Sequence, residues 1–134
     1  MRTTESYVTK QDANLLRTLF QRPDLEAVRR GGAMNPLIDA LREARVVDTV
    51  PATRVRLGST VRYIDERTGS TNLVTLTLPK DANTAPQHLS VLSPVATALL
   101  GRAVGERIEV SLPGDRTTAL RIVEVEQEEA LSEA

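Results

Sequence analysis

Residues 89–101, which read LSVLSPVATALLG, contain a short strand, a helix start and a helix stop in that order. Ser93 followed by Pro94 is typical of a helix N-cap and a first helical position, because a serine oxygen accepts an orphan amide hydrogen and proline has none to leave unpaired. The apolar residues after Pro94 fall at helical spacing, and Gly101 ends the helix. A short helix with an apolar face that directly follows a strand must cover a sheet. This stretch therefore predicts an α+β fold.

Downstream of residue 51 the apolar residues recur with a period of two, as in strands. A turn at Gly69 joins the first two runs into a predicted β-hairpin, and a second turn follows Leu112. The last run changes phase at Val123, which indicates a bulge or a strand covered on both faces. Together these runs predict a small antiparallel sheet with one covering helix. Besides the strand that opens residues 89–101, the predicted strands cover residues 61–63, 74–78, 106–112 and 117–125.

Upstream of residue 51 the apolar spacing is that of helices. Thr9 is a candidate N-cap for a helix over residues 10–21, with Asp12 as the other half of a weak capping box. Residues 1–8 carry no such pattern, and we expect them to be loose.

The second part of this region predicts a tip and a returning helix. Asp24 is a candidate cap for a short turn that ends at Arg30, and Asn35 followed by proline begins another helix that runs to about residue 46. Two helices with one apolar stripe each bury those stripes together, so we expect an antiparallel hairpin of the coiled-coil kind with residues 23–33 at its tip. The predicted units are a helical hairpin over residues 1–50 and a sheet domain over residues 51–134.

The composition excludes several classes of protein. Lys and Arg total 17 against 18 Asp and Glu, so the chain lacks the strongly basic balance of a dedicated DNA binder. The absence of cysteine excludes disulfides and thiolate chemistry, and a single histidine excludes a multi-histidine metal site within one chain. We see neither a secretory signal nor an apolar run that could span a membrane. A cytoplasmic protein that binds neither membranes nor specific nucleic acid sequences is expected.

The predicted hairpin tip carries the first candidate site. Asp24 and Glu26 could together hold a cation such as Mg²⁺, although such ions need further oxygen ligands. A helix cap and a favourable charge in a first helical turn explain the two carboxylates more simply. Arg22, Arg29 and Arg30 flank them and could contact a phosphate or an acidic partner, while a solvated face is the usual role of such charges.

No convincing catalytic centre is visible. His88 has no serine or carboxylate neighbour in the sequence to act with, so we expect a surface or strand-edge histidine. Ser93 is a cap rather than a nucleophile, because no histidine follows it in a plausible triad. We therefore expect a binding or regulatory module without enzymatic activity, cofactor or metal.

Four motifs in fixed order resemble one family of bacterial proteins. They are LGSTV at residues 57–61, the stretch at residues 89–101, VGE at residues 104–106 and LPG at residues 112–114. This arrangement is similar to the C-terminal domain of the bacterial Gre transcript-cleavage factors. It resembles still more closely the related Rnk family, the regulators of nucleoside diphosphate kinase.

The resemblance implies an FKBP-like domain that docks on bacterial RNA polymerase at the rim of its secondary channel. The docking surface implied for this chain is Leu92, Ser93, Pro94 and Val95. Gre factors often carry an acidic residue where Leu92 stands, so one polar contact is missing here. The fold does not imply prolyl isomerase activity, because that activity needs an aromatic-lined pocket and residues 51–134 contain Tyr63 alone.

In Gre factors a long coiled coil carries acidic residues down the channel to the polymerase active site. The first helix predicted here would span only about 18 Å, so Asp24 and Glu26 fall short of that site. The resemblance to Rnk implies polymerase binding that competes with Gre factors without transcript cleavage. The alternatives are a Gre-type cleavage factor and a regulator of nucleoside diphosphate kinase that acts through another protein. The sequence leaves the oligomeric state open.

Overall fold

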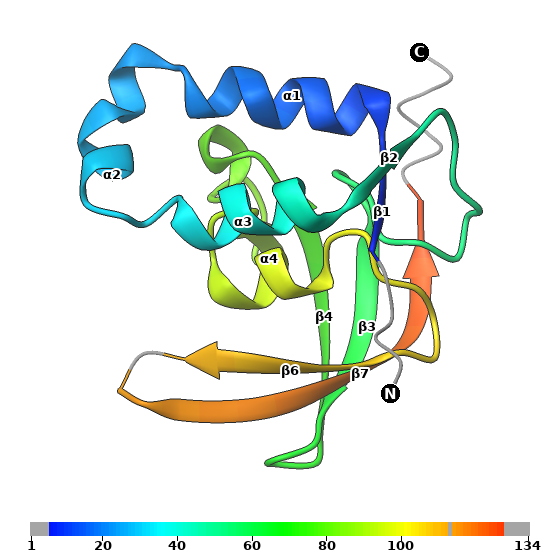
Figure 1. Cartoon of the computed structure of the whole chain (residues 1–134). Helices are drawn as coiled ribbons and strands as arrows, with labels where there is room; N and C mark the ends of the chain where they lie inside the picture. The colour runs from blue at the N-terminus through cyan, green and yellow to red at the C-terminus, as the bar shows by residue number, and fades with distance from the viewer. Residues whose placement is uncertain (1–5, 113, 128–134) are drawn as a thin grey trace.

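The computed structural model describes residues 6–112 and 114–127, and it confirms the α+β class (Figure 1). Within these residues, no helix combines the length and the apolar composition needed to cross a membrane. The helices are α1 (Lys10–Phe20), α2 (Glu26–Arg30), α3 (Asn35–Glu43) and α4 (Pro94–Leu99), with 3₁₀ turns η1 (Pro23–Leu25) and η2 (Pro79–Asp81). The strands are β1 (Tyr7–Thr9), β2 (Arg45–Val47), β3 (Thr60–Asp65), β4 (Ser70–Thr77), β5 (His88–Ser90), β6 (Arg107–Leu112) and β7 (Arg116–Glu126).

The larger sheet is curled and has the strand order β5-β4-β3-β7-β6. The pairs β3–β4, β3–β7 and β6–β7 are antiparallel, as predicted. The pair β4–β5 is parallel, with Thr75 opposite His88, so the expectation of a wholly antiparallel sheet is wrong. Residues 78–87 form the crossover connection that a parallel pair needs.

The phase change in the last strand is a β-bulge. In the β3–β7 ladder Arg62 lies opposite Glu124, whereas the next residue, Tyr63, lies opposite Ile122. Val123 is therefore left without a partner in this register, and its side chain is exposed. Of the two interpretations of the apolar pattern, the structure confirms the bulge, which lets the strand bury Ile122 while it turns Val123 outward.

The N-terminal segment is more ordered than its sequence predicts. Tyr7 and Val8 belong to β1, which pairs in parallel with β2, so the expectation of loose residues through position 8 is wrong for this part. The Tyr7 backbone N–H also donates to the Gly101 carbonyl at 3.0 Å. Gly101 has φ +82°, and a Cβ there would lie 3.1 Å from the Tyr7 carbonyl oxygen and 3.0 Å from the Ser6 Cβ. The approach of β1 to the end of α4 thus requires glycine. Residues 1–5 lie outside the described residues.

Helix α1 begins as predicted, because the Thr9 hydroxyl accepts from the Asp12 backbone N–H at 3.1 Å. Helix α3 runs in the opposite direction to α1 in Figure 1. Its start differs from the prediction. Asn35 is already inside the helix, and Met34 holds the N-cap position without a side-chain hydrogen bond. The helix also ends earlier than expected, at Glu43, because the following residues pair with β1.

The hydrophobic core is continuous across the described chain. Leu16 of α1 and Leu37 of α3 are fully buried and belong to the same cluster as Leu99 of α4 and Ile122 of β7. Helix α4 packs on β6, and α3 packs on α4. The helices before residue 51 therefore share their core with the sheet and with α4.

Candidate functional site

The strand-to-helix corner at the start of α4 is held by local hydrogen bonds. The Ser93 hydroxyl accepts from the Ala96 backbone N–H at 3.1 Å, which confirms the predicted N-cap. The Ser90 hydroxyl accepts from the Leu92 N–H at 3.1 Å, and the Ser90 carbonyl accepts from the Ser93 N–H at 2.9 Å. The Thr97 hydroxyl donates to the Val91 carbonyl at 2.8 Å and ties the helix back to the strand. The backbone of the corner is thereby fixed.

The four side chains of this corner present a small, uncharged surface. Pro94 is exposed, and Leu92, Ser93 and Val95 are half-buried. Leu92 and Val95 also pack against the core cluster. Because no side chain of this surface is charged, the arrangement can support contact by shape and apolar burial, and it offers no group for acid–base chemistry.

His88 has a structural environment. The Thr84 hydroxyl donates to the Asp81 carbonyl at 2.8 Å, and its oxygen lies 2.7 Å from His88 Nδ1. The hydrogen bonds hold the η2–β5 connection in shape and give the ring no catalytic partner among the described residues.

The predicted hairpin tip brings its charged residues together as ion pairs. The Arg22 guanidinium binds both carboxylate oxygens of Asp24. Arg22 Nε donates to Oδ1 at 3.0 Å, and Nη2 donates to Oδ2 at 2.8 Å. The hydrogen bond from Arg22 holds the pKa of the Asp24 carboxyl below its ordinary value. Asp24 lies inside η1, whose N-cap is Arg22, and makes no capping hydrogen bond. The prediction that Asp24 caps this turn is therefore wrong, because the adjacent guanidinium binds both of its carboxylate oxygens.

Glu26 is also bound by arginines of its own helix. Its carboxylate lies 2.9 Å from Arg30 Nη2 and 3.8 Å from Arg29 Nη2. Arg29 additionally donates from Nη1 to the Phe20 carbonyl at 2.9 Å, which fastens α2 to the end of α1. Within the part of the chain that the structure describes, no group of three acidic or histidine side chains is placed to hold a metal ion. The tip presents alternating paired charges instead of free carboxylates.

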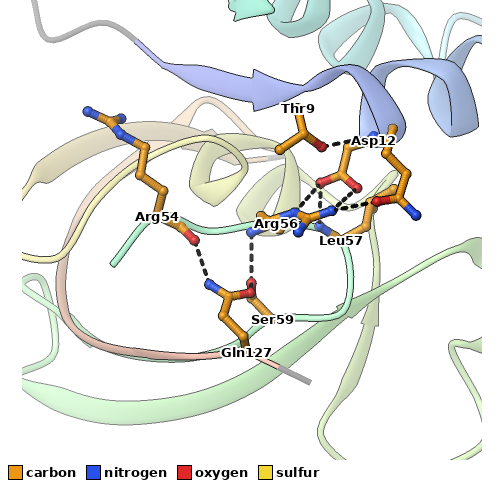
Figure 2. A network of polar contacts seen from close by, with 8 residues as sticks. Thr9, Asp12, Arg54, Arg56, Leu57, Ser59 and Gln127 are labelled. Atoms are coloured by element: carbon orange, nitrogen blue, oxygen red, sulfur yellow. Dashed lines mark hydrogen bonds and ion pairs between the residues drawn. The ribbon is translucent and has the colours of Figure 1, made fainter. Parts of the chain in front are cut away.

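A partly buried polar network that was not predicted joins α1 to the segment before β3 (Figure 2). Asp12 is only 2% exposed. Its carboxylate accepts from the Leu57 backbone N–H at 3.1 Å and from Arg56 Nη2 and Nε at 3.3 and 3.4 Å. Its predicted role as half of a capping box is wrong, because this distant guanidinium and amide bind the carboxylate.

The network continues to the end of β7. The Ser59 hydroxyl accepts from the Arg56 backbone N–H at 2.7 Å and donates to Gln127 Oε1 at 2.8 Å. Gln127 Nε2 donates in turn to the carbonyls of Arg54 and Ala52 at 2.8 and 3.0 Å. Three segments far apart in sequence are thus fixed to one another. The only signal of this network in the sequence is Asp12, a charged residue four positions before Leu16 on the apolar stripe of α1.

Comparison with known proteins gives a consistent relationship. Residues 41–127 match the family described as "Transcription elongation factor, GreA/GreB, C-term". A solved structure, "Prokaryotic transcription elongation factor GreA/GreB from Nitrosomonas europaea", is 34% identical with a TM-score of 0.66, over 92% of this chain and 99% of that one. The GreA transcription elongation factors of Brucella canis and Brucella suis are each 35% identical over 85 residues, or 62% of this chain and 54% of theirs. The chain spans about half the length of these curated relatives.

Proposed function

The chain belongs to the GreA/GreB C-terminal family of transcription elongation factors, and from that premise we propose that it binds bacterial RNA polymerase near the secondary channel. In this role the chain is a regulator and carries out no reaction of its own. The sheet with α4 is the FKBP-like docking domain, and α1 with α3 is the short hairpin at the channel mouth.

The docking surface in this proposal is the corner formed by Leu92, Ser93, Pro94 and Val95. The hydrogen bonds around Ser93 hold its backbone in one conformation, so little ordering entropy is lost on binding. Exposed Pro94 is rigid and lies at the centre of the corner. These are the properties of a preorganised apolar contact.

The paired carboxylates of the tip are the observation that carries the functional conclusion. Asp24 is bound by Arg22, and Glu26 by Arg30, so neither is a free metal ligand. Helix α1 has 11 residues and is therefore about 16 Å long, which limits its reach. We infer that the chain occupies the channel mouth and competes with Gre factors without stimulating transcript cleavage. This behaviour is of the Rnk type.

The first test measures binding of the fluorescently labelled full chain to bacterial core RNA polymerase, with an unlabelled Gre factor as competitor. Saturable binding that the Gre factor displaces is the expected result. The variant Pro94→Glu should bind at least about tenfold more weakly, because an added charge on an apolar contact must be desolvated. Pro51→Glu is the control, since Pro51 is likewise exposed and lies outside both the corner and the hairpin.

Halted elongation complexes then test the absence of cleavage. Addition of the chain should leave the rate of transcript shortening unchanged, whereas a Gre factor accelerates it. Accelerated shortening that is lost in Asp24→Ala would contradict the non-cleaving role and favour the cleavage factor. Failure to bind polymerase at micromolar concentration would overturn the whole proposal.

A further inference from the structure

The opposing helices α1 and α3 border a groove that shares no residue with the proposed docking surface at residues 92–95. Its volume is about 340 Å³, and it is bordered by Arg17 and Phe20 from α1 and by residues of α3 and β2. We call it the α1–α3 groove. Its main lining residues are Arg17, Phe20, Ile38, Leu41, Arg42 and Val46.

The floor of the groove is apolar and partly open to solvent. Val46 is 39% exposed, and Phe20 and Ile38 are half-buried. Isolated exposed apolar residues are normal on a protein surface. Here, however, they gather in one concave site between two helices, which is typical of a binding groove.

Arginine side chains from both helices flank this floor. Arg17 is exposed, and its one described contact is with the neutral Asn14, at 3.4 Å. Arg42 lies 3.3 Å from Asp39, and both of these side chains are largely exposed. No residue that lines the groove is acidic. Because acidic and basic residues nearly balance in the chain as a whole, the positive charge here reflects placement rather than composition.

We propose that the α1–α3 groove binds an amphipathic helix of a partner protein, with apolar residues on one face and carboxylates beside them. The apolar face would cover the floor, and the carboxylates would pair with Arg17 and Arg42. Helix-in-groove recognition uses apolar anchors at i, i+3 or i+4, and i+7. With 11 and nine residues, α1 and α3 are about 16 and 14 Å long, which is enough for such a set of anchors.

The charges argue against two other occupants. A second copy docked through the same groove about a two-fold axis would bring its own arginines against Arg17 and Arg42. An anionic membrane would gain only about 1 kcal/mol from each basic residue near its surface, so two arginines give weak attachment. The inference does not depend on the proposed docking surface, because residues 92–95 are not among those that line the groove.

Fluorescence anisotropy of two designed peptides, each titrated with the full chain, tests the proposal. Both peptides are about 16 residues long, so that they can form a helix. They share one leucine face and differ only in carrying glutamates or lysines beside it. The glutamate peptide should bind at micromolar concentration, and the lysine peptide at least about tenfold more weakly. Higher salt should weaken the glutamate complex.

Charge reversal of the groove supplies the decisive variant. Arg17→Glu combined with Arg42→Glu should reverse the preference, so that the lysine peptide binds better. The double variant Arg62→Glu in β3 and Arg67→Glu in the β3–β4 turn reverses two exposed charges away from the groove. It is the matched control and should keep the original preference. Should the groove variant fail to fold, Arg17→Gln and Arg42→Gln tested singly should each weaken the glutamate peptide several-fold.

Three results would overturn the proposal. The first is equal affinity of the two peptides for the unaltered chain. The second is an unchanged preference in the folded groove variants. The third is occupation of the groove by another ligand. It would appear as a dimer that Val46→Asp dissociates, or as binding of anionic vesicles or single-stranded RNA that displaces the glutamate peptide and is lost in the groove variant.

Discussion

The tip at η1 and α2 and the corner at β5 and α4 are both short turns that lead into short helices, yet they are stabilised differently. The tip is held by exposed ion pairs between neighbouring side chains, such as Arg22 with Asp24. The corner is held by hydrogen bonds to its backbone, and the far end of its helix ends at a glycine that β1 approaches closely. Exposed ion pairs contribute little to stability, whereas caps and buried backbone contacts contribute more. The tip can therefore vary in sequence at small cost, and the corner cannot.

Substitution of the two helix-ending glycines gives the sharpest test of this difference. Gly101→Ala should lower the free energy of unfolding by about 3 kcal/mol, because it adds left-handed strain and a clash with the backbone of β1. Gly32→Ala at the tip, also at positive φ, should cost about 1 kcal/mol, because a Cβ there meets only a side-chain atom of Asn35. Urea unfolding measures both. Equal losses would contradict the comparison.

The Asp12 network is expected to show the next largest effect. Asp12→Ala leaves the Leu57 amide and the half-buried Arg56 without their acceptor, which should cost about 2–3 kcal/mol. Asp39→Ala, which removes an exposed carboxylate of α3, is the control and should change stability by less than about 0.5 kcal/mol. Amide hydrogen exchange of Leu57 should accelerate in the first variant alone. A protected Leu57 amide in Asp12→Ala would show that another group replaces the carboxylate.

Removal of the α4 cap comes third. Ser93→Ala removes the acceptor of the Ala96 N–H and should cost about 1 kcal/mol. Ser93→Asp retains an acceptor and should restore stability. If thermal unfolding gives the same midpoint for the alanine and aspartate variants, the cap is not what fixes this corner.

The tip ion pair should give the smallest effect on stability. The Arg22 guanidinium lowers the pKa of Asp24, so any stability from the pair is present above the ordinary carboxyl pKa and is lost as the pH falls through the lowered value. Arg22→Gln should return the Asp24 pKa toward its ordinary range in an NMR titration. The unfolding midpoint at neutral pH should stay almost unchanged. A clear fall in that midpoint would mean that the tip contributes to the fold.

Local patterns predicted much of this fold. The caps at Thr9 and Ser93, the hairpin around Gly69 and the bulge at Val123 each depend on residues close in sequence. The order and approximate limits of the helices and of the main strands followed from them. The sequence also located the charged residues of the tip in one place, and the structure shows that they form ion pairs with one another.

The remaining features depend on contacts between distant residues. Asp12 and Arg56 are separated by 44 positions, and nothing near either residue indicates the other. Tyr7 and Val8 are residue types that favour strands, but so short a strand forms only because β2 and Gly101 are beside it. The parallel direction of β5 likewise follows from the path of its connection.

The continuous core has a practical consequence for expression of the protein. A recombinant fragment limited to residues 41–127, the part that matches the family, would lose β1 and α1 and would uncover apolar side chains that those elements bury. It would also leave Arg56 without Asp12. We expect such a fragment to aggregate, so the segment that matches the family is smaller than the unit that can be purified. Fusion partners and affinity tags are better placed before β1 than at the family boundary.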